Sequence, residues 1–264
     1  VAKIIPGCNI NIGSPEFEYF MPKIVFNDTN IPGSSSGGRE QNLKIDKFTL
    51  NFNFFSFSPF GLSFLAELEF LNQKIEAKIV PSFNSVSVLI ENNATKSSQK
   101  RTNKVSLKEI SPFIPKVTLT GDIYLSTIYT EIDYKAGLKD LTLNIASDNL
   151  KLPSQKIMGF KTPNLNFAQF LLQANMVSSS ELHLKKFILG EEKSPVIAQI
   201  VGKVDINKRK FPLSKINLET ELKISEAILN DYPILKFPLQ QFDSKNKFYQ
   251  IPIKGTIARP KFGN

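Results

Sequence analysis

Ala198-Gln-Ile-Val-Gly-Lys-Val-Asp-Ile206 alternates apolar and polar residues, and Gly202 falls in phase with the apolar ones. The same alternation surrounds Gly121 and Gly255. A period of two residues is typical of a β-strand with one buried face. Because glycine leaves a gap in that face, we expect a bulge, a bend or a close approach of another backbone at each glycine. These segments predict a strongly curved sheet.

Period-two alternation recurs along most of the chain and predicts an all-β fold. We expect a large twisted, curved antiparallel sheet with a few short helices packed on it. The predicted strands are residues 16–20, 23–26, 44–57, 62–70, 74–80, 85–90, 116–126, 129–135, 140–146, 181–189, 195–207, 214–223 and 250–257.

Three segments are predicted to be helical. Apolar residues recur at helical spacing after Asn166, a candidate N-cap, which predicts a helix over Phe167–Met176 packed on the apolar side of the sheet. Capping-box spacing from Ser106 to Glu109 predicts about one turn of helix before the following prolines. Residues 225–230 are the third and shortest candidate.

The chain has 264 residues, 22 of them Phe, and is long enough to bury a core of its own. We expect a single β-rich domain over residues 1–264, with the polar loop at 92–104 as the candidate sub-boundary. The Gly/Ser-rich stretch at 33–38 is interpreted as a loop tip, because it lacks the Gly-Lys-Ser/Thr ending of a phosphate-binding loop. Cys8 is the only cysteine, so an internal disulfide is excluded.

The formal net charge is +9, but most charges alternate with apolar residues, as on a solvated sheet face. Two denser basic groups stand out. They are Lys96, Lys100, Arg101 and Lys104 in the polar loop, and Lys203, Lys208, Arg209, Lys210 and Lys215 around a predicted hairpin turn. No aromatic-basic RNA signature accompanies them, so we expect no nucleic-acid partner.

The single histidine, His183, shares a strand face with Glu181 and Lys185, which is typical of an exposed strand residue. With one histidine and one cysteine, the chain cannot assemble the usual His/Cys zinc site by itself. Every histidine-based catalytic triad would have to use His183.

Two carboxylate pairs, Glu16/Glu18 and Glu219/Glu221, have a spacing that fits either an acid pair or an exposed strand face. We favour the exposed face. The sequence therefore predicts no catalytic, cofactor-binding or metal-binding residues, no cofactor and no enzymatic activity.

Several segments of the second half share the pattern of one family of envelope proteins. They are Leu138-Lys-Asp-Leu-Thr-Leu-Asn-Ile145, Leu150-Lys-Leu-Pro-Ser154, the segment from Phe167, Gly202-Lys-Val-Asp-Ile206 and Tyr249-Gln-Ile-Pro-Ile-Lys-Gly-Thr-Ile-Ala-Arg-Pro260. Together they resemble the type II secretion system protein N family, within the AsmA-like group. The ending Gly-Thr-Ile-Ala-Arg-Pro is the most specific part of a resemblance that covers residues 105–262.

The resemblance implies a noncatalytic component or accessory protein of a bacterial type II secretion system. It implies a periplasmic domain held at the inner membrane by an N-terminal helix, with other secretion-system subunits as partners. No run here approaches the roughly 18 apolar residues of a spanning helix, so we expect that anchor upstream of Val1.

Two modes of action stay open. A structural component would bind other subunits through unpaired strand edges. An AsmA-like lipid-binding or lipid-transfer protein would instead offer acyl chains an apolar trough, which requires an apolar strip that helices leave uncovered. Candidate lining residues are Phe48, Phe52, Phe54, Phe55 and Phe57, for which packing in a core is the favoured interpretation.

Overall fold

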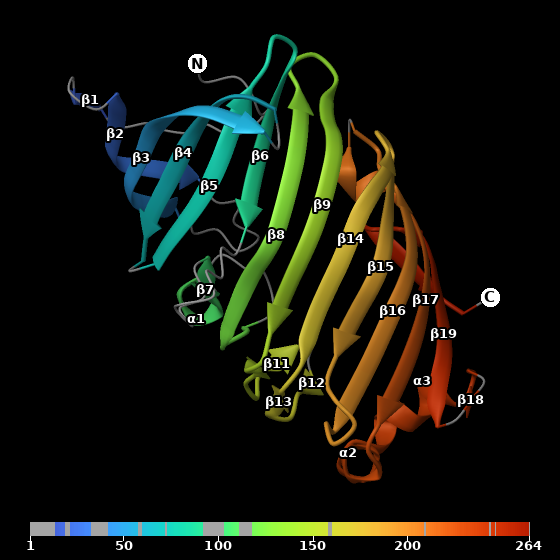
Figure 1. Ribbon diagram of the computed structural model, residues 1–264. Coiled ribbons are helices and arrows are strands. Elements are labelled where there is room, and N and C mark those ends of the chain that lie inside the picture. Colours follow the sequence, from blue (N-terminus) through green and yellow to red (C-terminus); the bar gives the residue numbers. More distant parts are fainter. Residues whose placement is uncertain are drawn as a thin grey trace.

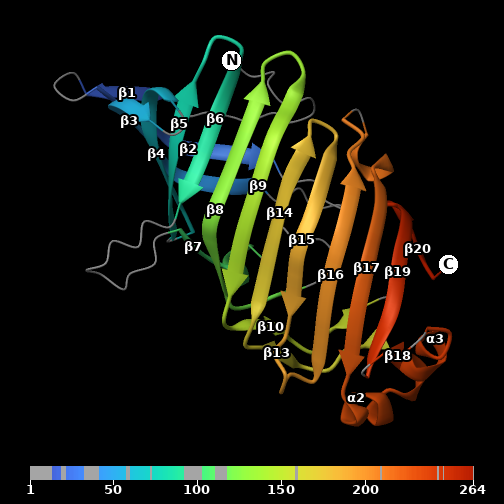
Figure 2. The same ribbon diagram turned by 45° about the vertical axis from the view of Figure 1, so that its right-hand side comes forward.

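One 16-stranded antiparallel sheet dominates the computed structural model, and most strands pair with their neighbours in the sequence (Figure 1). The structure describes residues 14–18, 22–32, 42–57, 60–71, 73–91, 103–110, 118–157, 160–208, 210–242, 244–245 and 247–263. Figure 2 shows the strands from β8 onward side by side along a curved surface, with β1 to β3 turned steeply away from them. The prediction of a large, curved antiparallel sheet with few helices is confirmed.

The sheet follows the order β1-β2-β3-β4-β5-β6-β8-β9-β14-β15-β16-β17-β19-β18, with β7 also paired to β8 and β20 to β19. Its strands are β1 (Pro15–Glu18), β2 (Lys23–Pro32), β3 (Asn42–Phe57), β4 (Phe60–Phe70), β5 (Gln73–Pro81), β6 (Ser85–Glu91), β7 (Lys104–Ser106), β8 (Asp122–Asp133), β9 (Gly137–Ser147), β14 (Phe170–Ser178), β15 (Glu181–Leu189), β16 (Val196–Asp205), β17 (Lys215–Ile224), β18 (Ser244–Lys245), β19 (Phe248–Thr256) and β20 (Arg259–Phe262).

Small elements are inserted between the long strands. Two separate two-stranded sheets pair β10 (Leu150–Leu152) with β13 (Leu165–Phe167), and β11 (Lys156–Ile157) with β12 (Phe160–Lys161). The helices are α1 (Leu107–Ile110), α2 (Glu226–Asp231) and α3 (Lys236–Leu239), with short 3-10 turns η2 (Phe211–Leu213) and η3 (Pro233–Leu235). The predicted helical turns near residues 106–109 and 225–230 are confirmed as α1 and α2.

The two ends of the long strands differ in their connections. We call one the hairpin end, because it carries the short β5–β6, β8–β9, β14–β15, β16–β17 and β19–β20 connections. The opposite insertion end carries the longer segments after β6, β9 and β17, with α1, β10 to β13, α2 and α3 (Figure 1). The insertions therefore gather at one end of the sheet.

The sheet has an apolar face and a polar face, as period-two alternation requires. The apolar face is the one that carries Phe52, Ile79, Leu143, Leu184 and Leu218. The polar face carries the residues between them, including Lys78, Thr142, Lys203 and Glu219. Antiparallel pairing holds each face in register from strand to strand.

The three glycines of the recurring pattern lie at close backbone approaches. Gly121, Gly202 and Gly255 have φ angles of +105°, +143° and +100°. A Cβ at Gly121 would lie 2.2 Å from the Asn149 carbonyl oxygen, and one at Gly202 would lie 2.3 Å from the Asn217 carbonyl oxygen. Only glycine fits these positions without backbone movement, so their predicted conformational role is confirmed.

The predicted helix over Phe167–Met176 is wrong. The segment forms the end of β13 and most of β14, which pairs with β9 on one side and β15 on the other. Its apolar residues fit a period of two as well as a helical period, and Phe170 and Ala174 belong to both patterns. Two neighbouring strands offer hydrogen bonds and a matching apolar face, so tertiary context overrides the helical spacing.

Some strand boundaries also differ. The predicted strands 116–126 and 129–135 overlap one strand, β8, which begins at Asp122 and ends at Asp133, and a register shift between Leu125 and Thr127 restores its alternation. In β3, Phe48, Leu50 and Phe52 share the apolar face. A register shift follows Asn53, and the side chains of residues 54–56 lie outside the described part. The loop at 33–38 and most of the polar loop at 92–104 also lie outside it.

Candidate ligand-binding face

An unbroken apolar row crosses eight neighbouring strands on the apolar face. Paired one to the next, its residues are Ile253, Leu218, Gly202, Leu184, Ala174, Leu143, Ile128 and Ile90. Strands lie about 4.8 Å apart, so the row is roughly 34 Å long. This length is similar to the roughly 30 Å hydrocarbon thickness of a bilayer.

In β17, and in β16 from Ala198 onward, the apolar face is more shielded than the polar face. Along β16, Gln199 and Lys203 on the polar face are exposed, whereas Ala198 is buried and Ile200 is half-buried on the apolar face. Even the apolar Val201 is 43% exposed, because it points to the polar face. Side chains of the apolar face thus contact one another but keep part of their surface accessible.

Two buried clusters cover the apolar face at the insertion end. One consists of Leu107, Leu150 and Phe167, packed against the sheet residues Phe170, Leu189 and Val196. The other consists of Leu229, Leu239 and Ile251, packed against Leu222, Tyr249 and Ile253. Among the described residues, no helix lies on the apolar face between these clusters and the hairpin end (Figures 1 and 2). The described residues thus cover the face at the insertion end.

A pocket of about 320 Å³ continues the apolar face at the N-terminal strands. It is lined by Phe17, Pro22, Lys23, Ile24, Leu50, Phe52 and Phe64. Phe52 and Phe64 are in edge-to-face contact, with their ring centroids 5.5 Å apart. Phe48 and Phe52, expected from the sequence as candidate lining or core, are half-buried on this face.

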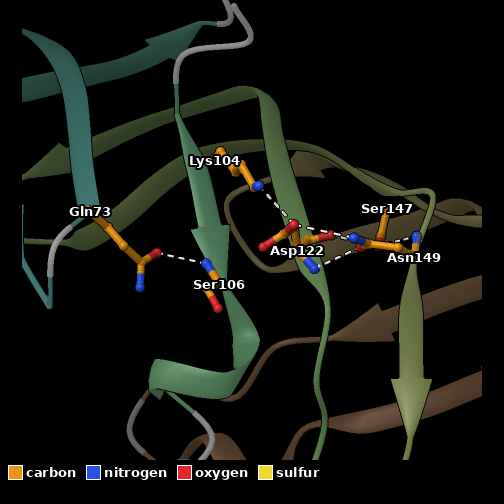
Figure 3. Close-up of polar contacts among 6 residues, drawn as sticks. All are labelled: Gln73, Lys104, Ser106, Asp122, Ser147 and Asn149. Carbon is orange, nitrogen blue, oxygen red and sulfur yellow. Dashed lines mark hydrogen bonds and ion pairs between the residues drawn. The ribbon is translucent and has the colours of Figure 1, made fainter.

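A polar cluster at the start of β8 is the second candidate site (Figure 3). Lys104 Nζ lies 2.8 Å from Asp122 Oδ2, and Asn149 Nδ2 donates to the same oxygen at 3.2 Å. The Asp122 backbone N–H donates to Asn149 Oδ1 at 2.8 Å, and Ser147 Oγ donates to the Asp122 carbonyl at 2.6 Å. These bonds tie β7 and the turn after β9 to β8.

The environment of Asp122 favours its ionised form. Partial burial alone would raise its pKa, but hydrogen bonds from Lys104 and Asn149 hold the pKa of Asp122 below its ordinary value. The bond to Asp122 in turn raises the pKa of Lys104. The cluster pairs its groups with one another and with backbone atoms, so we interpret it as a structural brace.

His183 and the two carboxylate pairs that the sequence singled out lie apart from one another, and Glu219 and Glu221 are exposed on one face of β17. His183 is on the polar face of β15, where its ring nitrogen contacts the Glu181 carboxylate. Glu16 is in β1 and accepts a hydrogen bond from Asn27, whereas Glu221 is in β17 and accepts one from Gln250. Within the described residues, no three His, Cys, Asp or Glu side chains are grouped to hold a metal ion.

The two groups of basic residues named from the sequence are only partly within the described residues. Lys96, Lys100 and Arg101 lie outside the described residues, as does Cys8, whereas Lys104 is part of the polar cluster. Lys203, Lys208, Lys210 and Lys215 are exposed in and around the β16–β17 connection, at the hairpin end.

Sequence reasoning missed the exposed aromatic residues of the hairpin tips. Phe83 lies in the turn Pro81-Ser-Phe-Asn84, and Tyr134 lies in Asp133-Tyr-Lys-Ala136. An aromatic residue among turn-forming residues, where no core position is expected, is the signal that would have found them.

No protein-family model, no curated protein and no solved structure matches this chain. In the part of the chain that the structure describes, no helix is long and apolar enough to cross a membrane.

Proposed function

We propose that this protein is a noncatalytic lipid-binding protein that holds acyl chains along the apolar face of its curved sheet. The observation that carries the proposal is the apolar row from Leu218 to Ile90, on which no helix of the described residues lies; at the end of the row, Ile253 packs against the cluster of α2 and α3. An uncovered apolar strip was the feature expected of a lipid carrier rather than of a purely structural subunit.

The chemistry of the face favours a hydrocarbon occupant. The side chains along the row are aliphatic, so they offer a ligand contact area and no hydrogen bonds. Each methylene group moved from water onto such a surface contributes about 0.8 kcal/mol. Ten buried methylenes therefore contribute on the order of 8 kcal/mol, from which the cost of immobilising the chain is subtracted.

Native mass spectrometry of the gently purified protein tests this proposal, because it reports bound lipid directly. The wild-type protein should carry phospholipid or fatty acid, and the double variant Leu143→Gln, Leu184→Gln should lose most of it. The matched control is Val201→Gln, a substitution on the opposite face of the same sheet. Lipid-free wild-type protein, or equal loading of the double variant and the wild type, would contradict the proposal.

A second candidate function follows from the resemblance to the type II secretion system protein N family. In this alternative the protein is an accessory subunit in the periplasm beside the inner membrane, and it binds other secretion-system subunits through strand edges. The last strand, β20, supports it: all four residues are exposed, and among the described strands it pairs with β19 alone. Unpaired edges are templates for β-augmentation.

Affinity purification of the full-length protein from envelope extracts separates the two candidates. The N–H of Phe262 faces away from β19, so Phe262→Pro removes a backbone donor from the free edge of β20. Recovery of secretion-system subunits that is lost in this variant favours the accessory subunit. Stoichiometric lipid without such subunits favours the lipid-binding protein.

A further inference from the structure

Large apolar side chains are exposed along the hairpin end of the sheet. Phe83, at the tip of the β5–β6 connection, has a relative exposure of 102%, and Phe211 in the β16–β17 connection is 60% exposed. Leu213 in the same connection, Tyr134 in the β8–β9 connection and Ile257 in the β19–β20 connection are exposed as well. The connections that carry them follow one another along the same end of the sheet (Figures 1 and 2). A row of this kind marks an interaction surface, unlike apolar residues scattered singly.

Hydrogen bonds join two neighbouring tips and fix the backbone of the turns that carry Phe83 and Tyr134. The Tyr134 N–H donates to the Asn84 carbonyl at 2.9 Å, which links the β8–β9 tip to the β5–β6 tip. Asp133 Oδ1 accepts from the N–H groups of Lys135 and Ala136 at 2.8 and 2.7 Å and fixes the turn. Between the tips lies a pocket of about 250 Å³ lined by Phe83, Asn84, Asp133, Tyr134 and Lys135.

The β16–β17 connection is also fixed. Ser214 is fully buried, and its Oγ accepts from the Asn207 N–H at 2.9 Å. Its carbonyl accepts from the Ile257 N–H at 3.0 Å, which joins this connection to the β19–β20 turn. These bonds hold the backbone while Phe211 and Leu213 stay exposed, so their exposure is a property of a defined loop.

Basic side chains accompany the exposed apolar ones. Exposed lysines and arginines at this end are Lys135, Lys208, Lys210, Lys215 and Arg259. Of the acidic residues described there, Asp133 accepts hydrogen bonds from its own turn and Glu181 contacts His183, while Asp205 is exposed. The hairpin end therefore combines apolar tips with an excess of positive charge.

The insertion end has the opposite character. Its apolar residues are packed into the two clusters around Phe167 and Leu239. None of the exposed large apolar side chains of the described residues lies in the segments 148–169, 190–195 or 225–247. The apolar face is thus covered at the insertion end and reaches toward the end where the exposed tips lie.

We propose that the hairpin end docks on the surface of an anionic phospholipid bilayer. Phe83, Tyr134, Phe211 and Leu213 enter the interfacial region, where amphipathic and aromatic side chains are favoured. The lysines and arginines lie among the anionic headgroups, whose charge they complement. Docked in this way, the apolar face meets the bilayer at the hairpin end. Docking of the hairpin end does not depend on whether the apolar face carries a lipid.

Tryptophan reporters test the docking, because the natural chain contains no Trp. Phe83→Trp and Phe211→Trp place a reporter at two tips, and Val201→Trp places one on the polar face in mid-sheet. With vesicles of phosphatidylcholine and phosphatidylglycerol, emission should shift to the blue and be quenched by brominated acyl chains for the two tip reporters alone. Vesicles of phosphatidylcholine alone should give a much weaker response.

Charge substitutions supply an independent measurement in vesicle sedimentation. Each lysine near an anionic surface changes the partition coefficient about fivefold, so Lys208→Gln with Lys210→Gln should lower it roughly 25-fold. Lys151→Gln with Lys193→Gln, at the insertion end, is the matched control and should leave it unchanged. Circular dichroism confirms that each variant is folded.

Tip reporters that keep the emission of water-exposed Trp in the presence of anionic vesicles would overturn the docking proposal and assign the exposed tips to a protein partner. A blue shift of the Val201→Trp reporter alone would overturn it as well. Lipid carriage is measured on co-purified lipid and docking on added vesicles, so the two proposals fail separately.

Discussion

Replacing Gly202 by alanine should destabilise the fold strongly, because the clash it creates is with backbone. The new Cβ would lie 2.3 Å from the Asn217 carbonyl oxygen and 2.7 Å from the Leu218 Cα, and no side-chain rotation relieves either contact. Overpacking of this kind costs about 1–3 kcal/mol. Holding a non-glycine residue at a φ of +143° adds about 1–3 kcal/mol. We expect a total loss of about 2–6 kcal/mol in the free energy of unfolding.

Gly137→Ala is the matched control for this substitution. Gly137 also has a positive φ, +76°, but a Cβ there would meet nothing within 4 Å. Only the backbone conformation then contributes, at about 1–2 kcal/mol. Urea unfolding followed by circular dichroism gives the free energy of unfolding of both variants. If the two variants lose equal stability, the close approach of β17 to Gly202 plays no energetic part and the reasoning is refuted.

Substitutions at three further residues test the brace, a buried asparagine and the single histidine. The pKa of Asp122 is below its ordinary value in the folded protein, so its stabilisation is present above the unfolded pKa and lost as pH falls through the folded pKa. Asp122→Asn should therefore flatten the acid side of the plot of melting temperature against pH, and an unchanged slope would contradict this. Asn103 is buried at a φ of +61°, accepts from the Glu76 N–H at 2.7 Å and donates to the Glu91 carbonyl at 2.8 Å. Both Asn103→Gly and Asn103→Ala lose these bonds, and urea titration should show the alanine variant less stable by about 1 kcal/mol, since glycine tolerates positive φ. His183→Gln should leave the melting temperature unchanged, because the contact with Glu181 is on the solvated polar face; a large drop would show a structural role.

The candidate site could be foreseen only in part. Alternation predicted a strand over residues 181–189 with His183, Glu181 and Lys185 on one face, which leaves Leu184 on the other, and Glu181–Leu189 forms β15 with the predicted bounds. It could not show that the segment Phe167–Met176 does not cover this face as a helix, because the segment fits two periods. Pairing with β9 and β15 makes it a strand of the sheet, so among the described residues this expected cover is missing.

The sequence by itself determined the β-class of the protein, the two faces of most strands and the positions where glycine is required. These properties depend on local alternation and on the steric limits of φ. Both are local properties of the sequence and do not depend on the tertiary fold. The tertiary structure alone decided that insertions gather at one end, that Phe83 and Phe211 are exposed at the other, and that the apolar row from Ile90 to Ile253 is continuous. Those properties arise from pairing between strands distant in sequence, and the register and curvature of that pairing are set by the whole sheet.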